Sequence, residues 1–110
     1  MGHKWSISII LLVSIILLVF VSTGYAAFSN SLKVSFIDVG QGDSALIQGA
    51  DGFDVLIDGG RSSAGPTVVA YLREQGIDDI EVMVASHADS DHIGGLIDVL
   101  ELDDIPVESV

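Results

Sequence analysis

Apolar and polar residues alternate in three short stretches of the chain, and a period of two residues predicts β-strands. The three stretches are residues 32–39 (LKVSFIDV), 44–48 (SALIQ) and 53–58 (FDVLID). A glycine-rich GQGD segment separates the first two, and the Asp51–Gly52 pair between the last two is a hairpin signal. The sequence therefore predicts three consecutive strands joined by tight connections.

The pattern then changes to the helical period. Residues 67–75 (TVVAYLREQ) place Val68 and Leu72 on one side, with Pro66 in the first turn and Gly76 as the C-terminal cap. Three further elements are expected, namely a strand over residues 77–86, a helix over 93–102 and the start of a strand over 103–110. This order of strands and helices predicts an α/β fold, a layered sheet with helices on its outside.

The N-terminus has the layout of a secretory signal peptide. Residues 7–21 are uncharged and nearly all aliphatic, Lys4 precedes them, and Gly24 and Ala26 form a small-x-small pattern that favours cleavage after Ala26. The alternative is a retained membrane anchor over residues 5–21, because the run is close to the length of a spanning helix. Both interpretations export the rest of the chain, either secreted or anchored to the outer face of the membrane, and membrane contact is expected only through this segment.

After a leader of residues 1–26, residues 27–110 form the expected domain, which is strongly acidic. It carries three basic and sixteen acidic residues, a formal net charge of −13. Such a surface repels phosphate backbones, so nucleic acid stays open as a partner without support from the charge. The chain has no cysteine, which excludes disulfides, thiol nucleophiles and thiolate metal sites.

The segment ASHADSDHIGG (residues 85–95) gathers metal-ligand residue types at His87, Asp89, Asp91 and His92. It follows an apolar strand, and ligands of open α/β sheets collect at the carboxyl ends of strands. Imidazole and carboxylate without sulfur suit Zn, Mn or Fe, and four such groups could supply parts of two adjacent metal sites. The histidines argue against a calcium loop. The alternative is a solvated acidic loop in which Asp91 only caps the next helix.

Three motifs carry a resemblance to a known family: FIDVGQGDSALI (residues 36–47), LIDGG (56–60) and ASHADSDHIGG (85–95). The last resembles the His-x-His-x-Asp-His signature of the metallo-β-lactamase superfamily, with Asp89 in the place of the second histidine. Together the motifs resemble the subgroup of ComEC-type competence proteins, in which the His-x-Asp-x-Asp-His form is usual. The resemblance implies an αβ/βα sandwich with its metals at one edge between two β-sheets, of which this chain holds the first half.

The resemblance also implies roles for individual residues. The expected metal ligands are His87, Asp89, Asp91 and His92. A water activated by the metals would be the nucleophile, and Asp91 is also the expected catalytic residue because it could orient or deprotonate that water. The residues expected to support the site without binding metal are Asp58, Asp43 and Gln41. The aspartate at position 89 predicts an altered first metal site, with zinc as the expected ion and Mn or Fe as alternatives.

The predicted function is an exported metal-dependent hydrolase of phosphodiester or related ester bonds, acting on a small-molecule or phosphodiester substrate. Hydrolysis of β-lactams is less favoured, because that activity goes with the His-x-His form. The family's later ligands would lie beyond Val110, so catalysis is expected only if further sequence completes the site. The alternative function is an inactive or partial metal-binding or interaction module, and reading the coding sequence past Val110 would discriminate between the two.

Overall fold

A computed structural model of the chain describes residues 9, 12, 13 and 31–110. The expected signal peptide or anchor lies almost entirely outside these residues and stays a prediction. In the part of the chain that the structure describes, no helix is both long enough and apolar enough to cross a bilayer.

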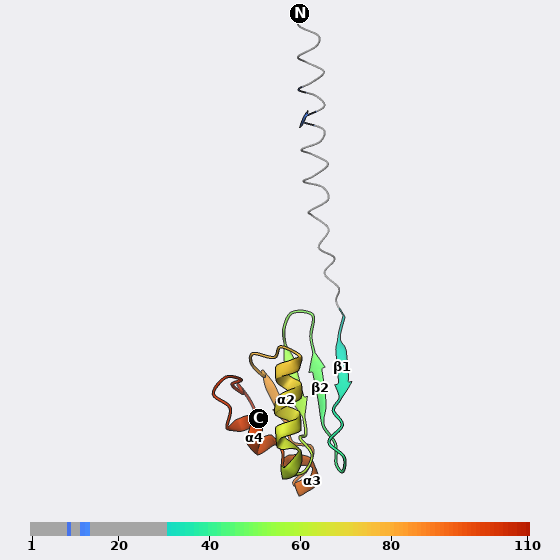
Figure 1. Ribbon diagram of the computed structural model, residues 1–110, viewed down its shortest axis with the longest axis vertical. Coiled ribbons are helices and arrows are strands. Elements are labelled where there is room, and N and C mark those ends of the chain that lie inside the picture. The colour runs from blue at the N-terminus through green and yellow to red at the C-terminus, as the bar shows by residue number, and fades with distance from the viewer. Residues whose placement is uncertain (1–8, 10–11, 14–30) are drawn as a thin grey trace, which may run out of the picture.

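The described fold is built on one four-stranded sheet (Figure 1). Its strands are β1 (Lys33–Phe36), β2 (Ala45–Gln48), β3 (Asp54–Ile57) and β4 (Val82–Val84). The order is β1-β2-β3-β4, with antiparallel pairing from β1 to β3 and parallel pairing between β3 and β4. The predicted strands are confirmed, each shorter than its alternating stretch. The expected last strand is present only as a parallel bridge between Ile80 and Val107.

The helical elements are η1 (Ser62–Ala64), α2 (Gly65–Glu74), α3 (Ser90–Ile93) and α4 (Leu96–Leu100). Helix α2 confirms the prediction and ends before Gly76, whose φ of 73° is a left-handed conformation that favours glycine. The single helix predicted over residues 93–102 is wrong. The segment forms two short helices: α3 begins three residues earlier than predicted, and Gly94 and Gly95 separate it from α4. A Cβ at Gly95 would collide with the carbonyl oxygen of Gly59, so this glycine lets the helical segment lie directly against the end of β3.

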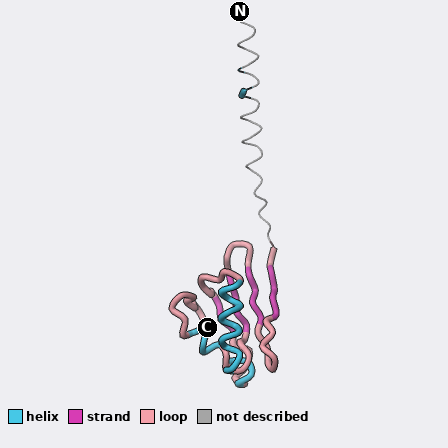
Figure 2. Tube along the Cα trace, in the orientation of Figure 1, coloured by secondary structure: helices cyan, strands magenta, loops and turns pink. Residues whose placement is uncertain are grey.

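One face of the sheet carries the core, and Figures 1 and 2 show α2 lying across it with α4 nearby. The core residues are Ile37, Leu46, Leu56, Val68, Leu72, Ile77, Ile80, Met83, Leu96, Val99 and Ile105. On the other face, the alternate positions of the strands form a second apolar surface, in which Phe36 is 85% exposed. The described helices therefore cover the sheet on one side only.

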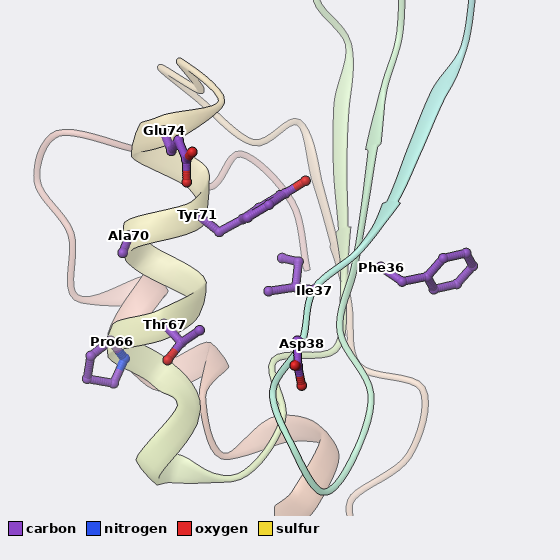
Figure 3. A pocket seen from close by; sticks show the side chains of 8 residues that line it. All are labelled: Phe36, Ile37, Asp38, Pro66, Thr67, Ala70, Tyr71 and Glu74. Atoms are coloured by element: carbon purple, nitrogen blue, oxygen red, sulfur yellow. The ribbon is translucent and has the colours of Figure 1, made fainter.

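A groove of about 630 Å³ runs between the edge strand β1 and α2 (Figure 3). The side chain of Ile37 points toward α2 and Tyr71, whereas Phe36 points to the opposite side of the strand. The lining of the groove contains none of the residues predicted to bind metal. The groove is therefore separate from the predicted site.

Candidate metal centre

Asp58 stands at the point where β3 meets the loop that follows β4. Its backbone N–H donates to the carbonyl of Val84 at 2.9 Å, which extends the parallel pairing by one residue. Its φ is 57°, a left-handed conformation that aspartate and asparagine adopt more readily than other residues with a Cβ. Asp58 is only 3% exposed, so the sheet holds its carboxylate beneath the loop.

The Asp58 carboxylate accepts hydrogen bonds from Ser86 of that loop and from His92 of α3. Oδ1 accepts from the backbone N–H of Ser86 at 2.8 Å, and Oδ2 accepts from the Ser86 hydroxyl at 2.5 Å and lies 3.0 Å from His92 Nδ1. Burial alone would raise the pKa of Asp58, but the bonds from Ser86 and His92 outweigh it and hold the pKa below its usual value. Asp58 is therefore ionised, and it joins both ends of the histidine-containing segment to the sheet.

The two histidines of the segment lie against each other. Their ring centroids are 3.9 Å apart with an interplanar angle of 50°, and His87 Nδ1 lies 2.8 Å from the Ser86 hydroxyl. Ligand atoms of Asp58, His87 and His92 all lie within 4.8 Å of one another, the one such group found among the described residues. Two imidazoles without sulfur fit Zn, Mn or Fe, and the carboxylate beside them can bind the ion or orient a ligating imidazole. The arrangement can therefore hold a divalent metal.

The two other predicted ligands lie beside the remaining ring nitrogens. Asp89 Oδ2 is 3.4 Å from His87 Nε2, and Asp91 Oδ1 is 3.8 Å from His92 Nε2. Asp89 occupies the N-cap position of α3 without a side-chain capping bond, and Asp91 lies in the first turn, so the alternative in which Asp91 only caps the helix is wrong. The bond to Asp58 raises the pKa of His92, aided by the charges of Asp91, Asp58 and Asp43 and opposed by burial. Asp89 thus lies beside His87 and Asp91 beside His92, but neither carboxylate belongs to the group whose ligand atoms converge.

The GQGD loop lies against this cluster. Asp43 Oδ2 is 3.7 Å from His92 Nδ1, and a Cβ on Gly42 would collide with the backbone carbonyl of Asp91. Gln41 faces elsewhere, since its side-chain oxygen accepts a hydrogen bond from the guanidinium of Arg61. Of the two loop residues expected to support the site, the structure places Asp43 at the histidines and Gln41 on Arg61.

Sequence reasoning missed Ser86 and Arg61. Ser86 bridges the Asp58 carboxylate to His87, and its only sequence signal is its position between the apolar strand and the first histidine. Arg61 follows the Gly-Gly pair at the end of β3, and no pattern there distinguishes it from a solvated loop residue.

Comparison with known families gives one match. The family model described as the metallo-beta-lactamase superfamily matches residues 37–110, which include the GQGD loop, Asp58 and the whole histidine segment. Comparisons with curated proteins and with solved structures gave no match.

Proposed function

Because the chain belongs to the metallo-beta-lactamase superfamily, we propose that it acts as a metal-dependent hydrolase centred on His87 and His92. The observation that carries this proposal is the convergence of Asp58 and the two histidines at the carboxyl ends of β3 and β4. Ligands of α/β sheets bind at such strand ends.

The hydrogen bonds of the cluster support a division of roles. His92 uses Nδ1 toward Asp58 and His87 uses Nδ1 toward Ser86, so each presents Nε2 for a metal. Carboxylates that accept the second N–H of a ligating histidine fix its tautomer and orientation. Asp58 therefore acts as a positioning residue. The carboxylates of Asp89 and Asp91, beside the two Nε2 atoms, complete a nitrogen and oxygen ligand set for which we propose zinc.

A bound divalent cation supplies Lewis acidity and lowers the pKa of water toward neutrality. Asp91 is 31% exposed and stands beside His92 Nε2, so its carboxylate is reachable from solvent at the edge of the cluster. From there it can hold a water through one oxygen and accept its proton, which is the general-base role.

A phosphodiester or related ester is the substrate class that we propose. The GQGD and LIDGG motifs and the His-x-Asp-x-Asp-His form support it through their resemblance to ComEC-type proteins. The structure adds Arg61, whose guanidinium bonds to Gln41 in the loop that contacts Asp91. A guanidinium pairs with phosphate oxygens in a bidentate way, and Arg61 bonds to the loop that also brings Asp43 to the acidic centre. Arg61→Ala should therefore raise KM for a small phosphodiester more than it lowers kcat.

Two further parts of the proposal concern the complete fold and the N-terminal segment. The apolar sheet face that the described helices leave open, with Phe36 at its margin, supports the αβ/βα sandwich, in which a second sheet would cover it. The pattern of residues 5–21 supports export, either as a cleaved leader or as an anchor. The mass of the protein recovered outside the cell would distinguish the two forms.

The experiment combines metal content with hydrolysis of bis(p-nitrophenyl) phosphate. The full chain should retain about one or more zinc equivalents, and His87→Ala and His92→Ala should lose both metal and activity. His3→Ala changes the histidine of the predicted leader and should change neither. Equal and negligible metal in all four proteins would rule out the metal centre, whereas bound metal without hydrolysis would favour a metal-binding module.

A further inference from the structure

Strand β1 is an edge of the sheet, and among the described residues it pairs with β2 alone. The N–H of Ile37 donates to the carbonyl of Ser44 at 2.9 Å, one step beyond the last register pair of β1 and β2. In an antiparallel pair only every second residue bonds to the partner strand, so Ile37 and Ser35 bond inward. The backbone groups of Val34 and Phe36 therefore point away from the sheet, where a further strand could pair with them.

This edge lacks the features that usually prevent the addition of a strand. Edge strands are commonly protected by proline, by a bulge or by outward charges. The register of β1 with β2 is continuous, and residues 31–40 contain no proline. The one charged residue of β1, Lys33, donates to the side-chain oxygen of Gln75 at the end of α2, so it is turned toward the helix. Val34 and Phe36 are instead 48% and 85% exposed, which leaves the edge open and apolar.

The groove of about 630 Å³ lies between this edge strand and α2 (Figure 3). Ile37 contributes apolar surface from the strand side, and Ala70 and Tyr71 contribute it from the helix. A strand added to β1 would direct alternate side chains toward the α2 side of the sheet, and thus into the groove. Extended peptides bind edge strands in this way: main-chain hydrogen bonds supply affinity, and pockets for alternate side chains supply specificity.

The charges of the groove indicate the chemistry of its occupant. Asp38 and Glu74 are the only charged residues in the lining, both are exposed, and among the described residues neither forms an ion pair. The bond from Lys33 to Gln75 shows that β1 begins beside the end of α2, so the two elements run in opposite directions. Glu74 therefore lies at one end of the groove and Asp38 at the other, with the apolar residues between them. Such a groove complements a segment that is apolar in the middle and basic at both ends.

The length of the groove sets the spacing of those basic residues. The helix residues that line it extend from position 66 to position 74, which is about 12 Å at 1.5 Å per residue. An extended strand covers about 13 Å in four steps of 3.3 Å, and residues four apart lie on the same face of a strand. Two basic residues at positions i and i+4, with an apolar residue at i+2, would therefore match the groove.

We propose that the edge of β1 and the groove beside α2 bind an extended segment of a partner protein, with lysine or arginine at i and i+4 around an apolar stretch. The segment pairs with the backbone of Val34 and Phe36 as an additional strand. A second copy of this chain is a poorer occupant, because two chains of net charge −12 repel each other. The groove contains no residue of the histidine centre, so this inference does not depend on metal binding.

The test uses the full chain and a fluorescein-labelled peptide of sequence SKVIVKS, whose two lysines and isoleucine share one face. Fluorescence anisotropy gives the affinity, and amide hydrogen exchange followed by NMR gives the place. We expect saturable binding and slower exchange at the amides of Val34 and Phe36. The peptide SEVIVES reverses the charges, and SKVPVKS has a central proline that is incompatible with a paired strand. Neither should bind in a saturable way.

Variants of the chain test the two sides of the groove. Asp38→Asn and Glu74→Gln should each weaken binding by about two- to five-fold, the scale of an exposed ion pair. Asparagine still provides an acceptor for the Gly40 N–H, so the loop after β1 should be retained. Ala70→Arg places a long cationic side chain in the groove without lowering helix propensity much, and should abolish saturable binding. Ala50→Arg makes the same change at an exposed position of the β2–β3 turn and should leave the affinity unchanged.

The outcomes separate this site from its alternatives. His87→Ala should bind the peptide like the wild type, whatever its effect on metal. The proposal would be overturned by absence of saturable SKVIVKS binding, by equal affinity for SKVPVKS or SEVIVES, or by an Ala70→Arg variant that binds normally. Protection of Val34 and Phe36 that rises with protein concentration in the absence of peptide would also overturn it, because the edge would then be covered by a second copy of the chain.

Discussion

Asp58→Asn is the substitution that most directly tests how the histidine centre is held. Asparagine keeps the size of the side chain and tolerates the left-handed backbone at φ 57°, so the end of β3 should stay in place. Its carbonyl oxygen can still accept the Ser86 backbone N–H. Its amide nitrogen, however, is a donor where the carboxylate Oδ2 accepted from His92 Nδ1.

The consequence falls on the tautomer of His92. Opposite an amide donor, Nδ1 must act as an acceptor, and the ring proton then moves to Nε2, the atom proposed to bind metal. Removing a partner of this kind costs about 10- to 100-fold in metal affinity. That corresponds to about 1.4–2.8 kcal/mol of binding free energy. The loss should therefore appear as weaker zinc binding by a chain that remains folded.

The assay is a competition titration of zinc against a chromophoric chelator at pH 7, with circular dichroism to confirm the fold. Asp54→Asn is the matched control, because it makes the same change in a buried aspartate at the other end of the same strand. That variant should bind zinc like the wild type. If Asp58→Asn retained wild-type zinc affinity, Asp58 would have no part in orienting His92, and the proposed division of roles would be wrong.

The pH dependence of this contact follows from the two pKa shifts. The raised pKa of His92 means that protons compete with zinc at a higher pH than at an ordinary histidine, about 6.5. Zinc affinity should therefore decline earlier on acidification in the wild type than in Asp58→Asn.

In the metal-free chain, the His92 contribution to stability is complete below about pH 6.5 and is lost as the pH rises through its raised pKa. The Asp58 contribution is complete above about pH 3.9 and is lost as the pH falls through its lowered pKa. The difference in the free energy of unfolding between the wild type and Asp58→Asn should thus be largest between about pH 4 and 6.5.

Two other predictions concern packing. Gly42→Ala and Gly40→Ala both place a Cβ at positive φ, which costs about 1–2 kcal/mol of stability. Only the Cβ at position 42 meets the Asp91 carbonyl. Only Gly42→Ala should therefore also weaken zinc binding in the same titration. Leu72→Ala empties a fully buried position of α2 and should lower the free energy of unfolding in urea by about 2–5 kcal/mol. Leu100→Ala, at a half-exposed position of α4, should cost less than about 1 kcal/mol, and equal losses would contradict the described core.

Much of the sheet and α2 could be predicted because their signals are local. Alternation in residues 32–58 depends only on which face of the sheet each side chain occupies, and Gly76 marks the end of α2 through its backbone conformation. The division between α3 and α4 could not be predicted in the same way. The spacing of Leu96 and Leu100 is helical, and the close approach of Gly95 to Gly59 depends on tertiary packing.

The residues of the histidine centre also differ in whether their signals are local. His87 and His92 lie in one short segment whose composition already indicates metal binding. The contact between His92 and Asp58 joins residues 34 positions apart, and it follows from the parallel register of β3 and β4, which no local pattern contains. Only the family resemblance pointed to Asp58.

The connectivity of the sheet has a consequence for the order in which the molecule forms. Strands β1 to β3 pair with their immediate neighbours in sequence, so their contacts close short loops. The parallel pairing of β3 with β4 must wait for a crossover that includes α2, and the bonds from Asp58 to Ser86 and His92 span 28 and 34 residues. Contacts of long sequence separation form late in small domains. We therefore expect the antiparallel strands to be structured before the histidine centre exists, so that zinc is captured only by chains that have completed the crossover.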